Sequence, residues 1–248
     1  MTEALFLSDL HAPQVGDTFT LDGDEGRHAA AVRRIRVGET ITVADGAGTG
    51  IRGPVVSTDK ASVTLEVAEV LTAGIPPIRY HAVQALAKGD RSELAVEMLT
   101  EIGVDRIIPW QSSRSVVKWT HDRQERQLGR WRTTAREATK QSRRLRVPIV
   151  TAAMPTSELL ELIPSMASAF VLHETAEMTL RRFDLPTQGD VLIIIGPEGG
   201  LTDQEVADFV AAGAHPLLIS DGVLRTSTAG VVALAQLQAF QHRVSKAK

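Results

Sequence analysis

Hydrophobic positions in residues 1–72 fall in short β-branched runs separated by glycine-containing turns. The run Ala61–Val67 alternates apolar and polar residues, as a half-buried strand does. Further strand-like runs occur at 41–43 and 54–56, with turn-forming Asp-Gly and Gly-rich steps between the runs. This pattern predicts a small β domain, either a compact barrel or a sandwich.

The pattern changes after Ala73–Pro77, where a Pro-Pro pair disfavours helix. From Ile78 onward, strand-like runs alternate with segments of helical periodicity, which predicts an α/β domain whose mostly parallel sheet has helices on both faces. We therefore expect a β domain over 1–73 and an α/β domain over 74–248. The expected strands are 80–86, 107–110, 149–152, 169–172, 191–195 and 217–220, and the expected helices are 90–102, 122–141, 157–163, 203–212 and 229–242.

Helix-capping residues support two of the expected helix starts. Asp90 with Glu93, and Thr202 with Glu205, have the spacing of a capping box. Gly103 and Gly213 stand where a helix end favours a left-handed residue.

Composition narrows the classes of function. Lys and Arg number 27 against 30 Asp and Glu, so a nucleic-acid surface would have to be local. Cysteine is absent, which excludes disulfides, thiolate metal sites and thiol nucleophiles. The seven histidines show no ligand spacing, and no apolar run is long enough to span a bilayer, so we expect no metal, no membrane contact and a cytoplasmic protein.

The segment most specific for chemistry is Val191–Gly200, a buried strand that runs into the turn Gly-Pro-Glu-Gly-Gly. Ligands of open α/β sheets bind at such carboxyl ends of strands, and glycines expose backbone N–H groups. The turn lacks the Gly-Lys-Ser/Thr of a phosphate-binding loop and is not placed as a dinucleotide fingerprint would be. It is either a structural turn or a ligand site, and Pro197 and Glu198 favour the ligand site.

A second loop, 219–230, joins the last expected strand to the last helix and carries Arg225, Thr226, Ser227 and Thr228. We expect it to meet the glycine-rich turn at one sheet edge and to form one pocket with it. The helix that follows is apolar almost all round, which indicates either burial within the monomer or a homodimer interface.

A third segment, 114–146, holds eleven Lys and Arg but three acids. Helical spacing places Leu128, Trp131, Ala135 and Ala138 on a buried face and leaves Arg132, Arg136, Lys140 and Arg143 as an exposed basic stripe. A second basic cluster, Arg27, His28, Arg33, Arg34 and Arg36, lies in the β domain. Together they predict an extended RNA or DNA partner, the alternative being solvated surface charge.

His173 and Glu174 follow the expected strand 169–172. They are either an acid/base pair or scaffold residues that hydrogen-bond the end of the strand. The chain shows no nucleophile elbow of a serine hydrolase.

The ordered set of motifs resembles the RsmE family of small-subunit rRNA uridine methyltransferases, which belong to the SPOUT class. The resemblance covers nearly the whole chain, since residues around His28 and Val32–Gly38 resemble the family's PUA-like RNA-binding module. The motifs that carry it are Lys88-Gly-Asp-Arg91, Glu101-Ile-Gly-Val104, Arg136-Glu-Ala-Thr-Lys-Gln141, Leu172-His-Glu174, Ile195-Gly-Pro-Glu-Gly-Gly200 and Leu224-Arg-Thr-Ser-Thr-Ala229.

The resemblance implies a PUA-like β-barrel followed by a trefoil-knotted α/β domain, a homodimer, and S-adenosylmethionine as methyl donor. It also implies methylation of a uridine at its ring 3-nitrogen in 16S rRNA of the small ribosomal subunit. The implied donor-binding residues are Leu172, His173, Glu174, Gly196, Pro197, Glu198, Gly199, Gly200, Ser220, Leu224, Arg225, Thr226 and Thr228. The implied RNA-binding residues are Arg27, His28, Arg33, Arg34, Arg36, Lys88, Arg91, Arg132, Arg136, Lys140, Arg143 and Arg144.

The uridine 3-nitrogen carries a weakly acidic proton, so its methylation needs that proton removed or the resulting anion stabilised. We expect Arg225 to stabilise the anion or fix the base, and Glu198 to orient donor or substrate. Where the family usually has Glu-Thr-Ala, this chain has Ser227-Thr-Ala229, which weakens the case for a general base at position 227.

Two alternatives stay open. One is a knotted methyltransferase that acts on a ribose 2′-hydroxyl or another base. The other is a non-catalytic RNA-binding assembly factor that uses only the β domain and the basic stripe.

Overall fold

The structure of the protein is a computed structural model, and it describes residues 3–246. The chain forms two compact units. The first contains the N-terminal residues up to Ile75 together with Thr139–Val147, and the second contains Pro76–Ala138 and the residues from Pro148 onward. A single boundary at residue 73 therefore leaves out the segment Thr139–Val147, which returns to the first unit.

The first unit is a six-stranded, mostly antiparallel sheet with the order β1-β3-β4-β5-β2 and β6 paired to β4. Only the pair β1–β3 is parallel. The ten-residue strand β4 pairs with β3, β5 and β6, and its pairing with β5 shifts register between Val55 and Ser57. The elements are β1 (Ala4–Leu7), β2 (Thr18–Leu21), α1 (Gly23–Arg27), η1 (His28–Val32), β3 (Thr40–Ala44), β4 (Thr49–Thr58), β5 (Val63–Glu66) and β6 (Glu69–Thr72).

The segment Thr139–Val147 is held in the first unit by polar contacts. The Lys140 Nζ atom lies 3.1 Å from Oε1 of Glu25 in α1. The Arg146 guanidinium donates to the carbonyl oxygens of Ala47 and Ala73. Lys140 is 8% exposed, so its place in the predicted exposed stripe is wrong. A buried ammonium needs a partner, and the Glu25 carboxylate draws Lys140 inward.

The second unit is built on a six-stranded sheet of order β12-β10-β11-β7-β8-β9, in which every pair is parallel. Near-continuous apolar runs make these strands, as expected for a sheet covered on both faces. The strands are β7 (Ile78–Ala85), β8 (Arg106–Trp110), β9 (Ile149–Val150), β10 (Ser168–Leu172), β11 (Gly189–Ile195) and β12 (His215–Leu217). The helices are α2 (Arg91–Glu101), α3 (His121–Gln141), α4 (Thr156–Leu162), η2 (Ile163–Ser165), η3 (Leu180–Arg182), α5 (Asp203–Ala211) and α6 (Thr226–Lys246).

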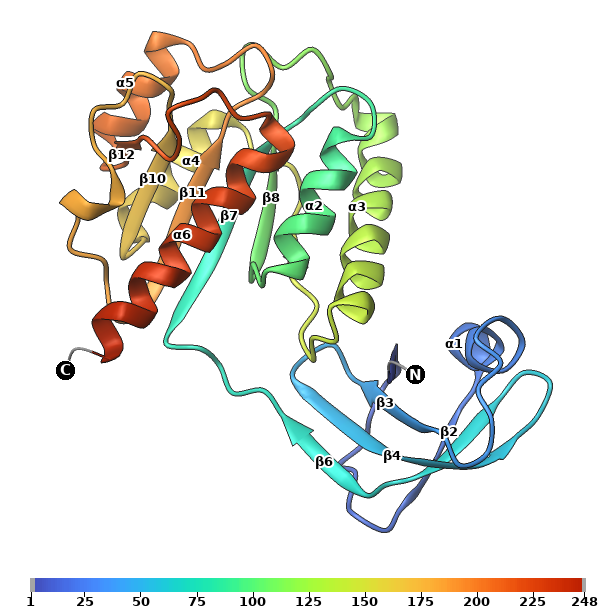
Figure 1. The fold of residues 1–248 in the computed structure, drawn as a ribbon. Coiled ribbons are helices and arrows are strands. Elements are labelled where there is room, and N and C mark those ends of the chain that lie inside the picture. Colours follow the sequence, from blue (N-terminus) through green and yellow to red (C-terminus); the bar gives the residue numbers. More distant parts are fainter. Residues whose placement is uncertain (1–2, 247–248) are drawn as a thin grey trace. The chain divides into compact units, whose positions relative to one another are not determined.

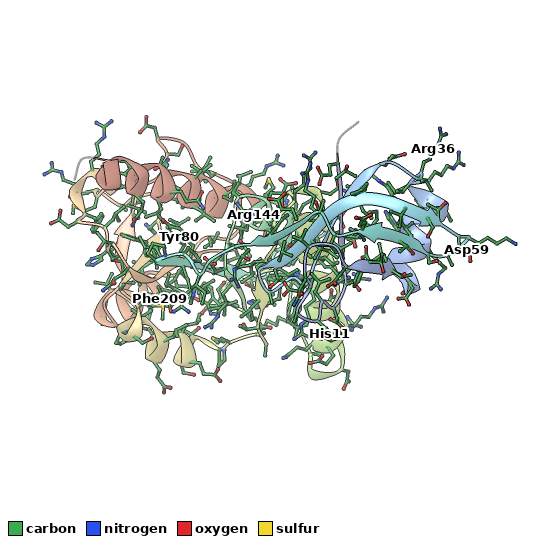
Figure 2. The ribbon with its side chains drawn as sticks, turned by 90° about the horizontal axis from the view of Figure 1, so that it is seen from below. His11, Arg36, Asp59, Tyr80, Arg144 and Phe209 are labelled. Carbon is green, nitrogen blue, oxygen red and sulfur yellow. The ribbon has the colours of Figure 1, made fainter. Side chains whose placement is uncertain are left out.

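Helices cover both faces of this sheet (Figure 1). On one face, α4 and α5 bury a cluster that includes Trp110, Leu192 and Phe209. On the other, α6 packs against α2, β7 and β11 (Figure 1). Phe209 lies inside the second unit, whereas Arg36 and Asp59 project from the first (Figure 2). The predicted parallel α/β layers are thus confirmed.

Local capping agrees with the sequence in one helix and differs in another. Thr202 and Glu205 form the predicted capping box at the start of α5. Asp90 makes no capping hydrogen bond, because its φ of −80° and ψ of 5° are not the extended conformation that a cap requires. The Ser92 hydroxyl, in the first turn of α2, accepts from the N–H of Ala87 in the preceding loop at 3.0 Å. Gly103 (φ +91°) supplies the predicted left-handed residue after α2, as Gly213 (φ +109°) does after α5.

Two boundaries near the sheet edge also differ from expectation. The last strand is His215–Leu217 and not 217–220, because Leu218 donates its N–H to the carbonyl of Met178 and leaves the ladder. The last helix begins at Thr226, so Thr226–Thr228 form its first turn. Among the described residues, no helix is long and apolar enough to cross a membrane.

Candidate active site

A cavity of about 530 Å³ opens at the carboxyl edge of the parallel sheet. Three loops from the second unit surround it, and they follow β10, β11 and β12. Because parallel strands end at the same edge, the chain brings these loops together although they are far apart in sequence. Of the implied donor-binding residues, the lining contains Leu172, His173, Glu174, Gly196, Pro197, Glu198, Gly199, Gly200, Ser220, Leu224, Arg225 and Thr226.

Thr228 is the implied donor-binding residue that the lining does not contain. Its hydroxyl donates to the carbonyl of Arg225 at 3.1 Å, within the first turn of α6. Ser227 is 3% exposed. Both residues are therefore part of the helix start and not of the cavity wall.

The glycine-rich turn after β11 needs glycine at two positions. Gly200 has φ +69°, which side chains rarely adopt. A Cβ atom on Gly199 would lie 3.2 Å from the carbonyl oxygen of Arg114 and 3.3 Å from its Cβ atom. The turn therefore packs directly against the loop that follows β8.

Glu198 projects from this turn and is held by two donors. Its Oε1 atom accepts from the backbone N–H of Lys88 and from Nη1 of Arg91, each at 3.1 Å. Partial burial would raise the pKa of this carboxyl, but hydrogen bonds from its own N–H, from Lys88 and from Arg91 outweigh it, so the pKa lies below its usual value. Glu198 is ionised at neutral pH and ties the loop after β7 to the glycine-rich turn.

Charged side chains of both signs line the cavity. Arg91, Arg114 and Arg225 bring three guanidinium groups, against the carboxylates of Glu174 and Glu198. Arg91 is paired with Glu198, whereas the exposed Arg225 has no ion-pair partner within the described chain. The site therefore keeps positive charge available to an anion.

His173 has a defined local partner. Its Nδ1 atom lies 2.9 Å from the Thr175 hydroxyl and 3.4 Å from the Thr175 backbone nitrogen. Since the backbone N–H can only donate, Nδ1 accepts, and the ring proton of the neutral form sits on Nε2. The Thr175 contact thus fixes the ring of His173, a residue that lines the cavity.

The buried hydroxyl of Thr226 connects two strand ends to α6. It donates to the carbonyl of Gly196 at 2.7 Å and accepts from Nε2 of Gln84 at 2.9 Å. Gln84 is fully buried at the end of β7, in register with Ile195 of β11. This network fixes the start of α6 against the glycine-rich turn.

Sequence reasoning missed one side of the cavity. Arg114 lines it from the loop after β8, and Leu201 and Leu218 line it next to segments that were predicted. Arg114 was counted only within the basic stretch, yet it follows β8, whose carboxyl end lies at the same sheet edge. The signal that could have found it is therefore the strand order, which places β8 beside β7.

The residues with an implied RNA role lie in both units. Lys88 and Arg91 are exposed, and Arg91 lines the cavity, while Arg132 and Arg136 are exposed on α3. Leu128, Trp131, Ala135 and Ala138 form the buried face of α3, which confirms the predicted side of that helix. In the first unit, Arg27, Arg33, Arg34, Arg36 and Arg143 are exposed, and His28 and Arg144 are half-buried.

Potential metal ligands do not gather in this structure. Within residues 3–246, no group of three or more His, Asp or Glu side chains could hold an ion.

Comparison with known proteins places the chain in a class and then in a family. A family model described as an RNA methyltransferase domain matches residues 75–238, and one described as an RNA methyltransferase PUA domain matches residues 21–68. The chain is therefore built as an RNA methyltransferase with an N-terminal PUA domain. It belongs to the ribosomal RNA small subunit methyltransferase E family.

Named relatives and a solved structure support this membership. The Mycobacterium bovis ribosomal RNA small subunit methyltransferase E is 38% identical, and the match covers 98% of this chain and 94% of that protein. The Bacillus subtilis protein of the same name is 30% identical, with 89% of each chain covered. The crystal structure of the Neisseria gonorrhoeae protein of that name, bound to S-adenosyl methionine, has a TM-score of 0.86 at 28% identity and covers 96% of this chain and 98% of that one.

Proposed function

We propose that the protein transfers a methyl group from S-adenosylmethionine to the 3-nitrogen of a uridine in 16S rRNA of the small ribosomal subunit. The observation that carries this proposal is the cavity itself. It joins a glycine-rich turn, an ionised carboxylate at Glu198 and a guanidinium at Arg225 with no ion-pair partner among the described residues. The Neisseria relative, which binds S-adenosyl methionine, supports the identity of the donor.

The residues of the cavity fit this donor. A volume of about 530 Å³ lies within the usual range of small-molecule sites, about 300–1,000 Å³. Leu172, Leu201 and Leu218 offer apolar contact to an adenine ring. The N–H groups of Gly199 and Leu201 have no acceptor within the described chain and are free to bind ligand oxygen or ring nitrogen atoms. The carboxylate of Glu174 is available to a cationic group.

When bound, S-adenosylmethionine supplies a methyl group activated for attack by a nucleophile. The task left to the protein is to make the uridine nitrogen nucleophilic. Arg225 stabilises the negative charge that develops on the base as its imide proton leaves, because a cation held near a developing anion lowers the barrier. Glu198 orients donor or substrate through its fixed position between Lys88 and Arg91.

The RNA binds through the basic residues of both units. Arg27, Arg33, Arg34 and Arg36 in the first unit, and Arg132 and Arg136 on α3, are exposed and attract the phosphate backbone. Arg91 lines the cavity and Lys88 donates its N–H to Glu198 there, so both are placed to bind RNA next to the target nucleotide. His28, Arg143 and Arg144 complete the set that contacts RNA.

The protein acts as a homodimer in the cytoplasm, where its ribosomal substrate is found. After its first turn, α6 is largely apolar and partly exposed, which supports the dimer. Sedimentation velocity tests it, since a species of about 27 kDa would contradict the dimer.

The experiment that tests the proposed function is methyl transfer from labelled S-adenosylmethionine to under-methylated small ribosomal subunits, followed by digestion and identification of the labelled nucleoside. 3-Methyluridine is the expected product. Label on a ribose or on another base overturns the proposed position of attack. If the protein binds RNA but transfers no label, the proposal that it is an enzyme is wrong, and an assembly factor is favoured.

A further inference from the structure

Arg114 contacts the glycine-rich turn at two alternate peptide units. Its Nη1 atom donates to the carbonyl of Gly199 at 3.3 Å and to that of Leu201 at 3.0 Å. The peptide units that begin at Gly199 and at Leu201 are therefore each held at their carbonyl end by one guanidinium nitrogen.

The same two peptide units are held at their amide ends as well. Gly200 donates its N–H to the carbonyl of Pro197 at 2.9 Å. Thr202 donates its N–H to Oε2 of Glu205, also at 2.9 Å. A planar peptide bonded at both ends has little freedom to rotate, so these two units have fixed orientations.

The peptide unit that precedes each of these two is left to meet a ligand. These preceding units carry the N–H groups of Gly199 and Leu201, and neither group has an acceptor in the part of the chain that the structure describes. Both residues line the cavity, and Leu201 is 6% exposed. An N–H without a partner on the buried residue Leu201 is costly, and a ligand acceptor would satisfy it. Gly199 is exposed, so its N–H is accessible to a ligand.

Glu205 fixes Arg114 from the other side. This carboxylate is 4% exposed, and its Oε1 atom accepts from the N–H of Ser113 at 2.7 Å. Burial would raise its pKa, but hydrogen bonds from Ser113 and Thr202 outweigh burial and lower it. The charged carboxylate thus joins the residue before Arg114 to the end of the glycine-rich turn.

We propose that Arg114 is a positioning residue, which holds the glycine-rich turn so that the N–H groups of Gly199 and Leu201 donate to the bound methyl donor. This inference rests on the proposed function, because it takes the cavity to be the donor site. Arg114 acts through the backbone and does not take part in the chemistry.

The test compares Arg114→Ala and Arg114→Lys with Arg181→Ala, an exposed arginine outside the cavity and outside the RNA-binding set. Calorimetry measures the affinity for S-adenosylhomocysteine, the stable demethylated product of the donor, whose binding can be measured without RNA. We expect about tenfold weaker binding for Arg114→Ala, because the hydrogen bonds that order the turn are lost. The loss of affinity should be smaller for Arg114→Lys, and Arg181→Ala should bind as the wild type does. RNA affinity without donor stays unchanged in all three.

Backbone amide NMR gives a second measurement that a purely structural role of Arg114 would not change. In the wild-type protein, the amide resonances of Gly199 and Leu201 should shift on saturation with S-adenosylhomocysteine, as those of new hydrogen-bond donors do. In Arg114→Ala, saturated at higher ligand concentration, these two shifts should shrink while those of other lining residues persist.

Two results overturn the inference. One is unchanged donor affinity in a folded Arg114→Ala protein. The other is a loss of RNA affinity with unchanged donor affinity, which would make Arg114 an RNA contact. A wild-type protein that binds donor but methylates another atom would refute the proposed function and leave this inference standing.

Discussion

The Thr226 hydroxyl donates a hydrogen bond to the carbonyl of Gly196, and the two oxygen atoms are 2.7 Å apart. Thr226 begins α6, and Gly196 begins the glycine-rich turn, so the bond joins two walls of the cavity across 30 residues of sequence. Nε2 of the buried Gln84 donates to the same hydroxyl. One threonine therefore satisfies two buried polar groups.

Replacing Thr226 by Val should destabilise the protein by about 1–3 kcal/mol, because the Gly196 carbonyl and the Gln84 amide both lose a buried partner. Denaturant unfolding measures the loss, and donor affinity should fall with it. The matched control is Thr226→Ser, which keeps the hydroxyl. Equal stability of the Val and Ser variants would show that the hydrogen bonds have no net effect.

Replacing Arg225 by Ala should lower kcat by roughly 10²–10³-fold, the usual effect of removing one group that stabilises transition-state charge. Donor affinity should change much less, since the lost interaction forms with the uridine. Raising the pH should recover part of the rate, because more uridine is then ionised in solution. Full turnover by the Ala variant would remove Arg225 from the mechanism.

Replacing Glu198 by Gln removes the charge but keeps an acceptor for Lys88 and Arg91. The hydrogen bonds to an ionised group are about twice as strong as neutral ones, so the turn should loosen and kcat/KM should fall roughly tenfold. Since the pKa of Glu198 lies below its usual value, the wild-type rate should show no titration of this group near neutral pH. Unchanged kinetics in the Gln variant would exclude an orienting role.

His81 should make the protein sensitive to acid. Burial and the positive charges of Arg106 and Arg79 lower its pKa from 6.5 to about 4, against the opposing effect of Asp190. As the pH falls below about 6.5, the unfolded chain binds a proton that the folded chain does not, so stability is lost between about pH 6.5 and 4. The loss is at most about 3 kcal/mol at the lower end.

The test is unfolding of the wild type and of His81→Gln as a function of pH. The Gln variant should lack this part of the pH dependence. Parallel curves for the two proteins would mean that His81 titrates equally in both states.

The basic residues should separate into two groups by their response to mutation. Arg132→Ala and Arg34→Ala should weaken RNA binding and reduce its salt dependence by roughly one unit of slope each, because each removes one phosphate contact. Lys140→Ala should instead destabilise the first unit, since it leaves the Glu25 carboxylate without its buried partner. RNA titrations at several salt concentrations, beside thermal unfolding, distinguish the groups. A Lys140 variant that is stable but binds RNA weakly would contradict this division.

The periodicity of apolar residues predicted the strands and the buried helix faces well, because each of these depends on the local apolar pattern. The alternation of Val63, Leu65 and Val67 and the buried face of α3 at Leu128 and Trp131 are confirmed. The trefoil knot stays a prediction, because it depends on the path of the chain and not on local pattern.

Contacts between residues that are far apart in the sequence determine the features that the local pattern does not predict. Helical spacing predicts that Lys140 is exposed. Its burial is explained only by the position of its partner Glu25. In the sequence, Arg114 is one of many basic residues in a charged stretch. Only the strand order, which places β8 beside β7, brings it to the cavity. The end of β12 at Leu217 depends on a carbonyl from Met178.

The central claim is that this cavity methylates the 3-nitrogen of a uridine in small-subunit rRNA. The most direct measurement incubates the wild type and Arg225→Ala in parallel with methyl-labelled S-adenosylmethionine and under-methylated small subunits, then identifies the labelled nucleoside by chromatography and mass spectrometry. We predict 3-methyluridine with the wild type and little or none with the variant. Label in any other nucleoside, or none with the wild type, would contradict the claim.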